Sequence, residues 1–427
     1  MIEERDTLYG AATPQALAEE TYENYKQYVN PPLARVMKLS GCPVETRAQG
    51  ATIWDQNGKA YLDFAGGYGV FTLGHSHARV VEAVRAQLEL MALSGKTMFD
   101  PLLGRASKRL AELTPGDLQI SFWCNSGTEA VEGAIKLARA ATGRATIVAT
   151  HGAYHGKTIG ALSASGREVF QAAFQPLLAD VKHVPYGDDR VLDEALEDAA
   201  AFLVEPVQGE GGINVPALGY LRAVRDACDR TGALFIADEV QTGLGRCGMR
   251  FGCDRDGVVP DVMTLAKGLS GGVVPVGVFI ARAGVWNRAF AKTPLAHTST
   301  FGGNPIACVA AIAAMDVLEE ERLAENAQIR GEQLLEGCRI IAAEYPAVVR
   351  EVRGLGLLVG VELTNEGYGG WIIPEMLKSG VTAAWTLNQQ RVIRLEPPLI
   401  VRESEVARAL TALKAGIATA HEKLGSL

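Results

Sequence analysis

The chain has 427 residues, of which 48% are hydrophobic and 21% are charged. This composition is typical of a soluble globular protein and excludes a disordered or a fibrous chain. The formal net charge of −8 argues against a broad nucleic-acid surface, so chemistry on small molecules is the better expectation.

The N-terminal residues predict an arm followed by a hairpin. Residues 13–29 read as a helix that Thr13 can cap. Residues 51–64 read as two strands around Asn57 and Gly58, because glycine accepts the positive φ that a tight hairpin turn needs.

The middle of the chain alternates amphipathic runs, such as residues 77–91, with short apolar runs. Five apolar runs predict strands that are buried on both faces: residues 145–150, 200–206, 233–239, 262–266 and 276–281. Because helical segments separate them, we expect an α/β fold with a large, doubly wound, mostly parallel sheet.

The C-terminal third predicts a smaller α+β unit. Residues 307–345 are helical in spacing but become charged around residues 319–322, where we place a hinge or domain boundary. Strand-like residues 350–363, a short helix, strand-like residues 391–399 and a final helix over 403–424 follow. The predicted organisation is an arm and small-domain segment at 1–65, a large domain at 66–318 and a small domain at 319–427.

The cysteines and the N-terminus favour a reducing compartment. The seven cysteines are widely spaced without a C-x-x-C pair, so we expect buried free thiols. The first ten residues lack the apolar segment of a secretory signal, and no stretch of 18 apolar residues occurs. We therefore expect a cytoplasmic protein with no membrane partner.

A capping box predicts a helix that begins after Ser126. Glu129 lies three residues later, and an apolar stripe follows at helical spacing. Gly127 and Thr128 then lie at a helix N-terminus, where free N–H groups and the helix dipole attract an anion such as a phosphate. An ordinary capped helix is the alternative.

Two charged residues follow predicted buried strands. Asp238 ends one strand, at the sheet edge where α/β proteins bind ligands, and it needs a cationic partner such as a structural arginine or a protonated pyridine nitrogen. Glu239 should point the other way. Lys267 follows a later strand, where desolvation would lower its pKa and make it a nucleophilic amine able to form a Schiff base. An ion-paired surface lysine is the alternative.

A phosphate cradle, a strand-end acid and a strand-end lysine are the three anchors that a pyridoxal phosphate enzyme needs. The sequence also resembles the class III (ω-) aminotransferases over nearly its whole length. The motifs that carry the resemblance are YLDFAGGYGVFTLGHSH, FWCNSGTEA, AYHGKTIGALSASG, VEPVQGEGG, IADEVQTGLGR, LAKGLSGG, STFGGNP and RLEPPL. The resemblance implies the aspartate-aminotransferase-like fold, fold type I of the pyridoxal phosphate enzymes.

The resemblance also implies roles for single residues. Lys267 matches the Schiff-base lysine, and Asp238 matches the partner of the pyridine nitrogen. The other implied cofactor contacts are Ser126, Gly127 and Thr128 at the phosphate, Tyr154 on the ring, Gln241 at the phenolic oxygen and Thr300 at the phosphate of a neighbouring subunit. Thr300 thereby implies a homodimer with composite active sites. His155, beside Tyr154, is a further candidate for the cofactor site or a neutral loop histidine.

Two more residues resemble substrate contacts of ω-aminotransferases. Glu210 matches a gating glutamate, and Arg394 matches an arginine that binds the carboxylate of a keto acid. The N-terminal segment and residues 386–399 look closest to the putrescine (diamine) aminotransferases. The expected activity is therefore ping-pong transfer of an amino group from a primary amine, a diamine or ω-amino compound, to a keto acid or aldehyde.

Alternatives remain on the same scaffold, because fold and cofactor do not determine the reaction. They are an aminomutase, a decarboxylase, a racemase or a catalytically silent cofactor-binding protein. His75 and His77 could ligate a metal but should diverge, so no metal site is expected.

Overall fold

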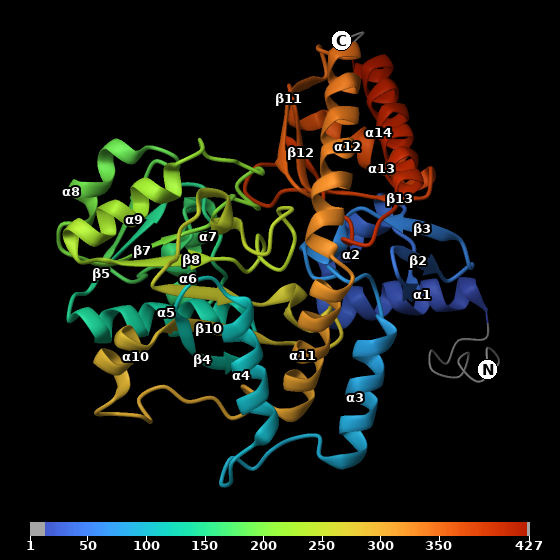
Figure 1. Ribbon diagram of the computed structural model, residues 1–427. Helices are drawn as coiled ribbons and strands as arrows, with labels where there is room; N and C mark the ends of the chain where they lie inside the picture. Colours follow the sequence, from blue (N-terminus) through green and yellow to red (C-terminus); the bar gives the residue numbers. More distant parts are fainter. Residues whose placement is uncertain (1–12, 425–427) are drawn as a thin grey trace.

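The computed structural model describes residues 13–424 (Figure 1). The N-terminal ten residues, for which we expect no signal segment, lie outside this range. The helices are α1 Pro14–Asn24, α2 Pro31–Leu39, α3 Ala78–Leu90, α4 Pro101–Leu113, α5 Gly127–Thr142, α6 Ile159–Ala164, α7 Glu168–Gln171, α8 Leu192–Leu196, α9 Tyr220–Thr231, α10 Ala283–Phe290, α11 Pro305–Glu320, α12 Leu323–Glu344, α13 Gly369–Lys378 and α14 Glu403–Leu424.

A seven-stranded sheet forms the centre of the larger part, in the order β4-β10-β9-β8-β7-β5-β6. Its strands are β4 Leu118–Cys124, β5 Thr146–Thr150, β6 Val181–Val184, β7 Ala199–Val204, β8 Leu234–Asp238, β9 Val262–Leu265 and β10 Gly277–Arg282. All five predicted apolar runs are strands of this sheet, so the predicted fold class is confirmed. β10 runs antiparallel to the other six strands. The sequence prediction missed β4 and β6.

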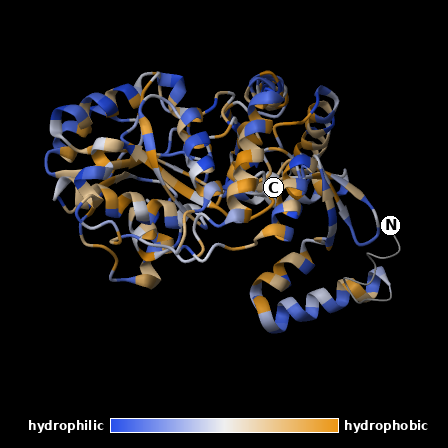
Figure 2. Cartoon of the chain, turned by 60° about the horizontal axis from the view of Figure 1, so that its bottom comes forward, coloured by the Kyte–Doolittle hydropathy of each residue, from blue (hydrophilic) through white to orange (hydrophobic). Residues whose placement is uncertain are grey.

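Helices cover both faces of this sheet, with α5 and α10 on one side and α8 and α9 on the other (Figure 1). Alternation along the strands explains this arrangement. Leu203 and Ile236 pack in one buried cluster with residues of α5, whereas Phe202 and Phe235 belong to the cluster that includes residues of α9. In Figure 2 the hydrophobic colour gathers on the strands and the inner helix faces. β7 and β8 therefore present apolar side chains to both helix layers.

Two smaller sheets contain the rest of the strands. The first has the order β1-β2-β3-β13 and the second β11-β12-β15-β14. Their strands are β1 Glu45–Gln49, β2 Thr52–Asp55, β3 Ala60–Asp63, β11 Val349–Leu355, β12 Leu358–Leu363, β13 Val381–Thr382, β14 Ala384–Trp385 and β15 Val392–Leu395. The predicted hairpin is present as β2 and β3. Because β13 pairs with β3, segments from the two ends of the chain share one sheet.

The predicted boundary near residues 319–322 coincides with a break between two long helices. Helix α11 ends at Glu320, and α12 begins at Leu323 after Arg322, whose φ is 52°. No helix among the described residues is long and apolar enough to cross a membrane. Six of the seven cysteines are buried free thiols, but the expectation of burial is wrong for Cys42, which is exposed.

Candidate active site

The carboxyl ends of β4, β5, β7, β8 and β9 meet at one edge of the large sheet, because these five strands run in the same direction. A cavity of about 660 Å³ lies there. Eight of the eleven predicted site residues line it: Ser126, Gly127, Thr128, Tyr154, His155, Asp238, Gln241 and Lys267. The fold thus brings together residues that are up to 141 positions apart, from Ser126 to Lys267.

Asp238 is buried at the end of β8 and is held by three neighbours. One oxygen lies 2.7 Å from Nδ1 of His155, and the other accepts from the Thr264 hydroxyl and from the Val240 N–H, both at 3.1 Å. Burial alone would lower the pKa of His155, but the hydrogen bond and charge of Asp238 raise it above its ordinary value. Asp238 is therefore a rigidly placed anion at the cavity wall.

Glu239 faces the other way, as expected from strand alternation. Its carboxylate accepts from the Thr242 hydroxyl and from the N–H groups of Gly252 and Cys253. Burial raises its pKa to about 6. These contacts hold the loop after β8 in place.

Lys267 follows β9 and lines the cavity with no hydrogen-bond or ion-pair partner for its amine among residues 13–424. Burial lowers its pKa, although the charges of Glu396 and Glu210 oppose this effect. Its φ of 46° is a left-handed conformation that typically costs a non-glycine residue about 1–3 kcal/mol. An amine with a lowered pKa, aimed at a cavity from a strained backbone, is suited to nucleophilic work.

Helix α5 begins at Gly127, as predicted, and Ser126 caps it by accepting from the N–H of Glu129 at 3.3 Å. The reciprocal half of the predicted capping box differs. The Glu129 carboxylate accepts from the backbone N–H of Asn125 at 2.5 Å and not from Ser126. The first-turn N–H groups of the helix still have no partner within the helix, so they can bind an anion at the cavity wall.

A second buried carboxylate at this edge, Glu205 after β7, was missed by the sequence analysis. It accepts from the N–H of Tyr154 at 2.9 Å and from the N–H of Gly209 at 3.1 Å. Burial raises its pKa to about 7. The same strand-end position that identified Asp238 could have identified Glu205, because residues 200–204 are a continuous apolar run.

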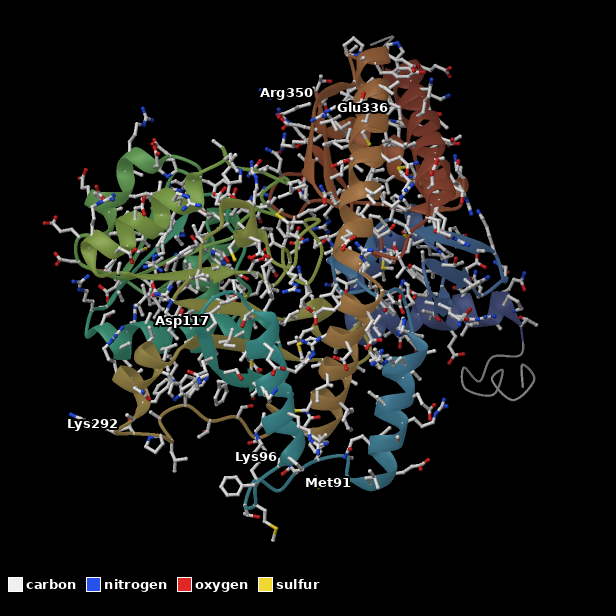
Figure 3. All side chains as sticks on the ribbon, in the orientation of Figure 1. Met91, Lys96, Asp117, Lys292, Glu336 and Arg350 are labelled. Atoms are coloured by element: carbon white, nitrogen blue, oxygen red, sulfur yellow. The ribbon has the colours of Figure 1, made fainter. Side chains whose placement is uncertain are left out.

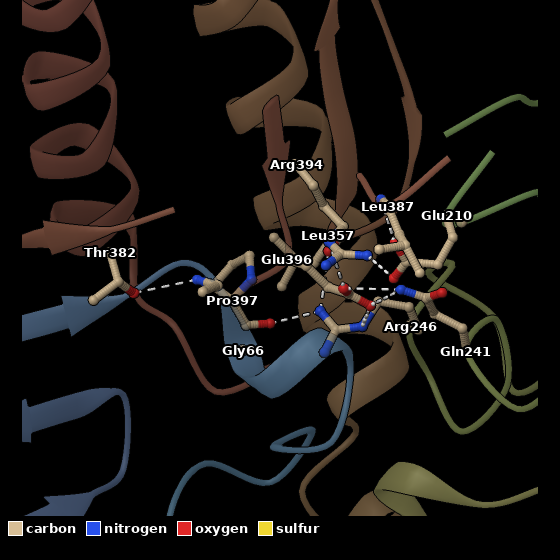
Figure 4. Close-up of polar contacts among 12 residues, drawn as sticks. Gly66, Glu210, Gln241, Arg246, Leu357, Thr382, Leu387, Arg394, Glu396 and Pro397 are labelled. Carbon is tan, nitrogen blue, oxygen red and sulfur yellow. Dashed lines mark hydrogen bonds and ion pairs between the residues drawn. The ribbon is translucent and has the colours of Figure 1, made fainter. Parts of the chain in front are cut away.

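Glu210 and Arg394 form a buried ion pair beside the cavity (Figure 4). The other oxygen of Glu210 accepts from the N–H of Leu387 at 2.7 Å. Burial alone would raise the pKa of Glu210, but Arg394 and Lys267 hold it below its ordinary value. Neither Glu210 nor Arg394 lines the cavity. Arg394 contacts Glu396, and Glu396 accepts from Gln241, which lines the cavity.

Gln241 lines the cavity, but its amide Nε2 donates to both oxygens of the buried Glu396, at 3.1 and 3.0 Å. Glu396 also contacts Arg394 and Arg246. The sequence analysis missed Glu396 and Arg246. A charged residue directly after the strand-like run of residues 391–395 was the available signal for Glu396.

Thr300 is exposed and is not among the residues that line the cavity. Its segment is held by Lys96, whose amine donates to the carbonyls of Ser299 and Gly302. Lys96 belongs to the connection between α3 and α4, where Figure 3 labels it together with Met91. The structure therefore does not bring Thr300 to the cavity of its own chain.

The two candidate metal ligands diverge. His75 Nε2 lies 2.8 Å from an oxygen of the buried Asp63, whereas His77 lies 3.3 Å from Glu321. Within residues 13–424, no group of three or more histidine, cysteine, aspartate or glutamate side chains is placed to hold a metal ion.

The cavity fits pyridoxal phosphate. Lys267 presents an unpartnered amine, the start of α5 presents N–H groups for a phosphate, and Asp238 presents an anion for a protonated ring nitrogen. Nε2 of His155, on the ring whose other nitrogen contacts Asp238, is buried without a partner in the described chain. These groups match a phosphorylated, cationic aromatic ring that carries a carbonyl.

Known proteins agree with this description. The model of the class III aminotransferase family matches residues 37–417. An ornithine aminotransferase from Toxoplasma gondii is 33% identical with a TM-score of 0.86, over 95% of this chain and 99% of that one. An (S)-enantioselective omega-transaminase from Thermomicrobium roseum is 30% identical with a TM-score of 0.87, over 94% and 98%.

An amine transaminase from an uncultivated Pseudomonas species, solved with pyridoxal phosphate bound, is 30% identical with a TM-score of 0.82, over 88% of this chain and 94% of that one. The family match, the shared fold and the cavity lead to one conclusion. The chain belongs to the class III aminotransferases and is a pyridoxal phosphate-dependent transaminase.

Proposed function

We propose that this transaminase moves the amino group of a primary amine without an α-carboxylate, a diamine or ω-amino compound, to a keto acid or aldehyde. The observation that carries the proposal is the buried pair of Arg394 with Glu210. An arginine beside the cavity suits a carboxylate, and a glutamate that neutralises it makes the same site tolerant of an amine whose tail has no carboxylate.

The proposed cofactor contacts are those that line the cavity. Ser126, Gly127 and Thr128 would bind the phosphate at the start of α5, and Tyr154 would contact the ring. When bound, pyridoxal phosphate supplies a carbonyl that condenses with amines and a ring that accepts the electron pair of a carbon losing its proton. Asp238 would keep the ring nitrogen protonated, and His155 holds Asp238 in place.

Lys267 has two proposed tasks. Its amine holds the cofactor until a substrate amine replaces it, and its free Nζ then takes the proton from the amine-bearing carbon of the substrate. The lowered pKa of Lys267 supports this role, because a larger fraction of the amine is uncharged near neutral pH. Gln241 lies between this site and Glu396 and is the proposed contact of the ring hydroxyl.

A second copy of the chain is proposed to complete each site through Thr300. This threonine is exposed on a segment clamped by Lys96, and the neighbouring Met98, Phe99 and Phe301 are also exposed. An exposed apolar patch of this kind is typical of a protein interface. The proposed homodimer therefore places Thr300 at the phosphate of its partner.

Separate single-turnover measurements of the two half-reactions test the proposed substrates. The absorbance of the cofactor-loaded protein should change when a diamine or ω-amino compound is added and should recover on adding 2-oxoglutarate, pyruvate or an aldehyde. Release of an aldehyde from the diamine confirms transamination. Carbon dioxide release, racemisation or an isomerised product without aldehyde would instead indicate a decarboxylase, a racemase or an aminomutase.

A further inference from the structure

Glu396 is a fully buried carboxylate that lies behind the cavity wall, directly after β15. One oxygen lies 3.2 Å from Nε of Arg394 and the other 3.7 Å from Nε of Arg246. Gln241, which lines the cavity, donates to both oxygens. Figure 4 shows this group of contacts between the two arginines. Glu396 thus touches the candidate carboxylate-binding arginine and a cavity residue at once.

Packing holds Glu396 in place, whereas Glu210 lies in a glycine-rich loop. Gly69 has a φ of 90°, and a Cβ added there would lie 2.6 Å from Oε1 of Glu396. Gly66 leaves room for the backbone carbonyl of Glu396, which a Cβ would approach to 1.9 Å. In contrast, Glu210 stands between Gly209 and Gly211. The carboxylate of Glu210 has two partners, Arg394 and the N–H of Leu387, whereas that of Glu396 contacts Gln241, Arg394 and Arg246.

The charges of this buried group balance before any substrate arrives. Arg394 and Arg246 supply two positive charges, and Glu210 and Glu396 supply two negative charges. A substrate carboxylate at Arg394 would give the group an excess negative charge, which is costly in a buried site unless Glu210 leaves. Without Glu396, the group would carry a net positive charge and would accept a carboxylate directly.

We propose that Glu396 is a positioning residue that sets substrate specificity by compensating the charge of Arg394 throughout the reaction cycle. Its carboxylate lies 3.2 Å from Nε of Arg394 as an ion pair, whereas Glu210 contacts Nη1, which a substrate carboxylate would take in its place. This compensation weakens the binding of carboxylates and favours amines that lack one. The inference rests on the proposed function and deepens it.

The test measures binding of glutarate, a dicarboxylate with no carbonyl to react, by isothermal titration calorimetry of the cofactor-loaded protein. Glu396→Gln should bind glutarate about tenfold more tightly than the wild type, because a buried negative charge near the ligand is removed. In steady-state turnover, this variant should lower KM for the keto acid more than it changes kcat. Combining it with Arg394→Met should abolish the gain, since the effect acts through Arg394.

Two further variants complete the design. Asp261→Asn removes another buried carboxylate, one that pairs with Arg225 at 2.8 Å and precedes β9 at the opposite sheet edge. Its glutarate affinity should equal that of the wild type. Glu396→Asp keeps the charge but withdraws it from Arg394, so it should bind glutarate more tightly than the wild type by a smaller factor.

Glutarate affinity of Glu396→Gln within twofold of the wild type, or weaker, would overturn the proposal. If Glu396→Gln does not fold, equal affinities of Glu396→Asp and the wild type would overturn it instead. Failure of the proposed function is a separate result, because it would show as a wild type that transfers no amino group from any diamine or ω-amino compound. The ratio of glutarate affinities is measured without that reaction.

Discussion

Replacing Arg394 by methionine should destabilise the protein and at the same time change its substrate preference. Methionine keeps much of the buried volume, so the main loss is the positive charge. Arg394 is fully buried, and Glu210 would be left nearly buried without its cation, while Glu396 would keep only Arg246. The change in stability therefore measures the contribution of one buried positive charge.

The expected loss of stability follows from this burial. Removing one partner of a buried ion pair costs about 3–5 kcal/mol, because the remaining charge is left uncompensated. With an unfolding entropy of ~2.1 cal/mol/K per residue, 427 residues give about 0.9 kcal/mol/K, so the thermal midpoint should fall by about 3–6 °C.

The loss should also depend on pH, with a definite sign. In the wild type, the pKa of Glu210 is held below its ordinary value, so its pairing stabilises the fold above that value and is lost as pH falls through the lowered pKa. In the variant, burial is left without Arg394 to oppose it and raises the pKa of Glu210. The difference between the two proteins should therefore be smallest well below the ordinary pKa of a glutamate and should grow towards pH 7.

Thermal unfolding of the cofactor-loaded proteins at several pH values measures this effect. Arg225→Met is the matched control, since it breaks the pair with Asp261 away from the cavity. The double variant Arg394→Met, Glu210→Gln should recover much of the lost stability, because it leaves no uncompensated Glu210 charge. Equal midpoints for the single and double variants, or a loss independent of pH, would refute the reasoning.

The remaining predictions concern catalysis and assembly. Arg394→Met should impair the half-reaction with 2-oxoglutarate far more than that with a diamine, and Glu210→Ala should favour carboxylated donors; equal losses in both single-turnover assays would mean that the pair is only structural. Lys267→Ala should abolish turnover yet retain cofactor non-covalently after gel filtration; substantial transamination without added amine would contradict this. Asp238→Asn should slow proton abstraction by about 10²–10³-fold in stopped-flow measurements, and near wild-type rates would rule out its role. The protein should be a dimer that loses cofactor affinity in Thr300→Ala, whereas a fully active monomer in light scattering would exclude a composite site.

Residues at strand ends could be predicted from the sequence because their position depends only on the strand pattern. Asp238 and Lys267 follow continuous apolar runs, and parallel strands bring their carboxyl ends to one edge. Glu205 obeys the same rule, because it directly follows the apolar residues of β7. Strands β4 and β6 were missed since their burial patterns include exposed and half-buried residues, which interrupt the apolar run.

The contacts behind the cavity wall could not be predicted, because they join segments far apart in the chain. Gln241 was expected to contact the cofactor's phenolic oxygen, and its contact with Glu396, 155 positions later, was not expected. The reciprocal capping bond from Ser126 was expected from a local pattern, but the Glu129 carboxylate reaches Asn125 instead. In both cases a side chain had two possible partners, and only the folded chain decides between them.

The contrast between strand-end and loop positions also supports the proposal that one cavity serves two kinds of substrate. Arg394 lies on β15 between two carboxylates, one held by close packing and one between glycines. If Glu210 moves aside for a substrate carboxylate, Arg394 exchanges one anion for another while Glu396 stays in contact. The arginine is then never buried without a counter-charge, so the exchange avoids the cost of about 3–5 kcal/mol that an unpaired buried charge incurs. With Glu210 as its only counter-charge, Arg394 would be uncompensated between the departure of Glu210 and the arrival of the substrate. The cost of an unpaired buried charge would then be incurred in every reaction cycle.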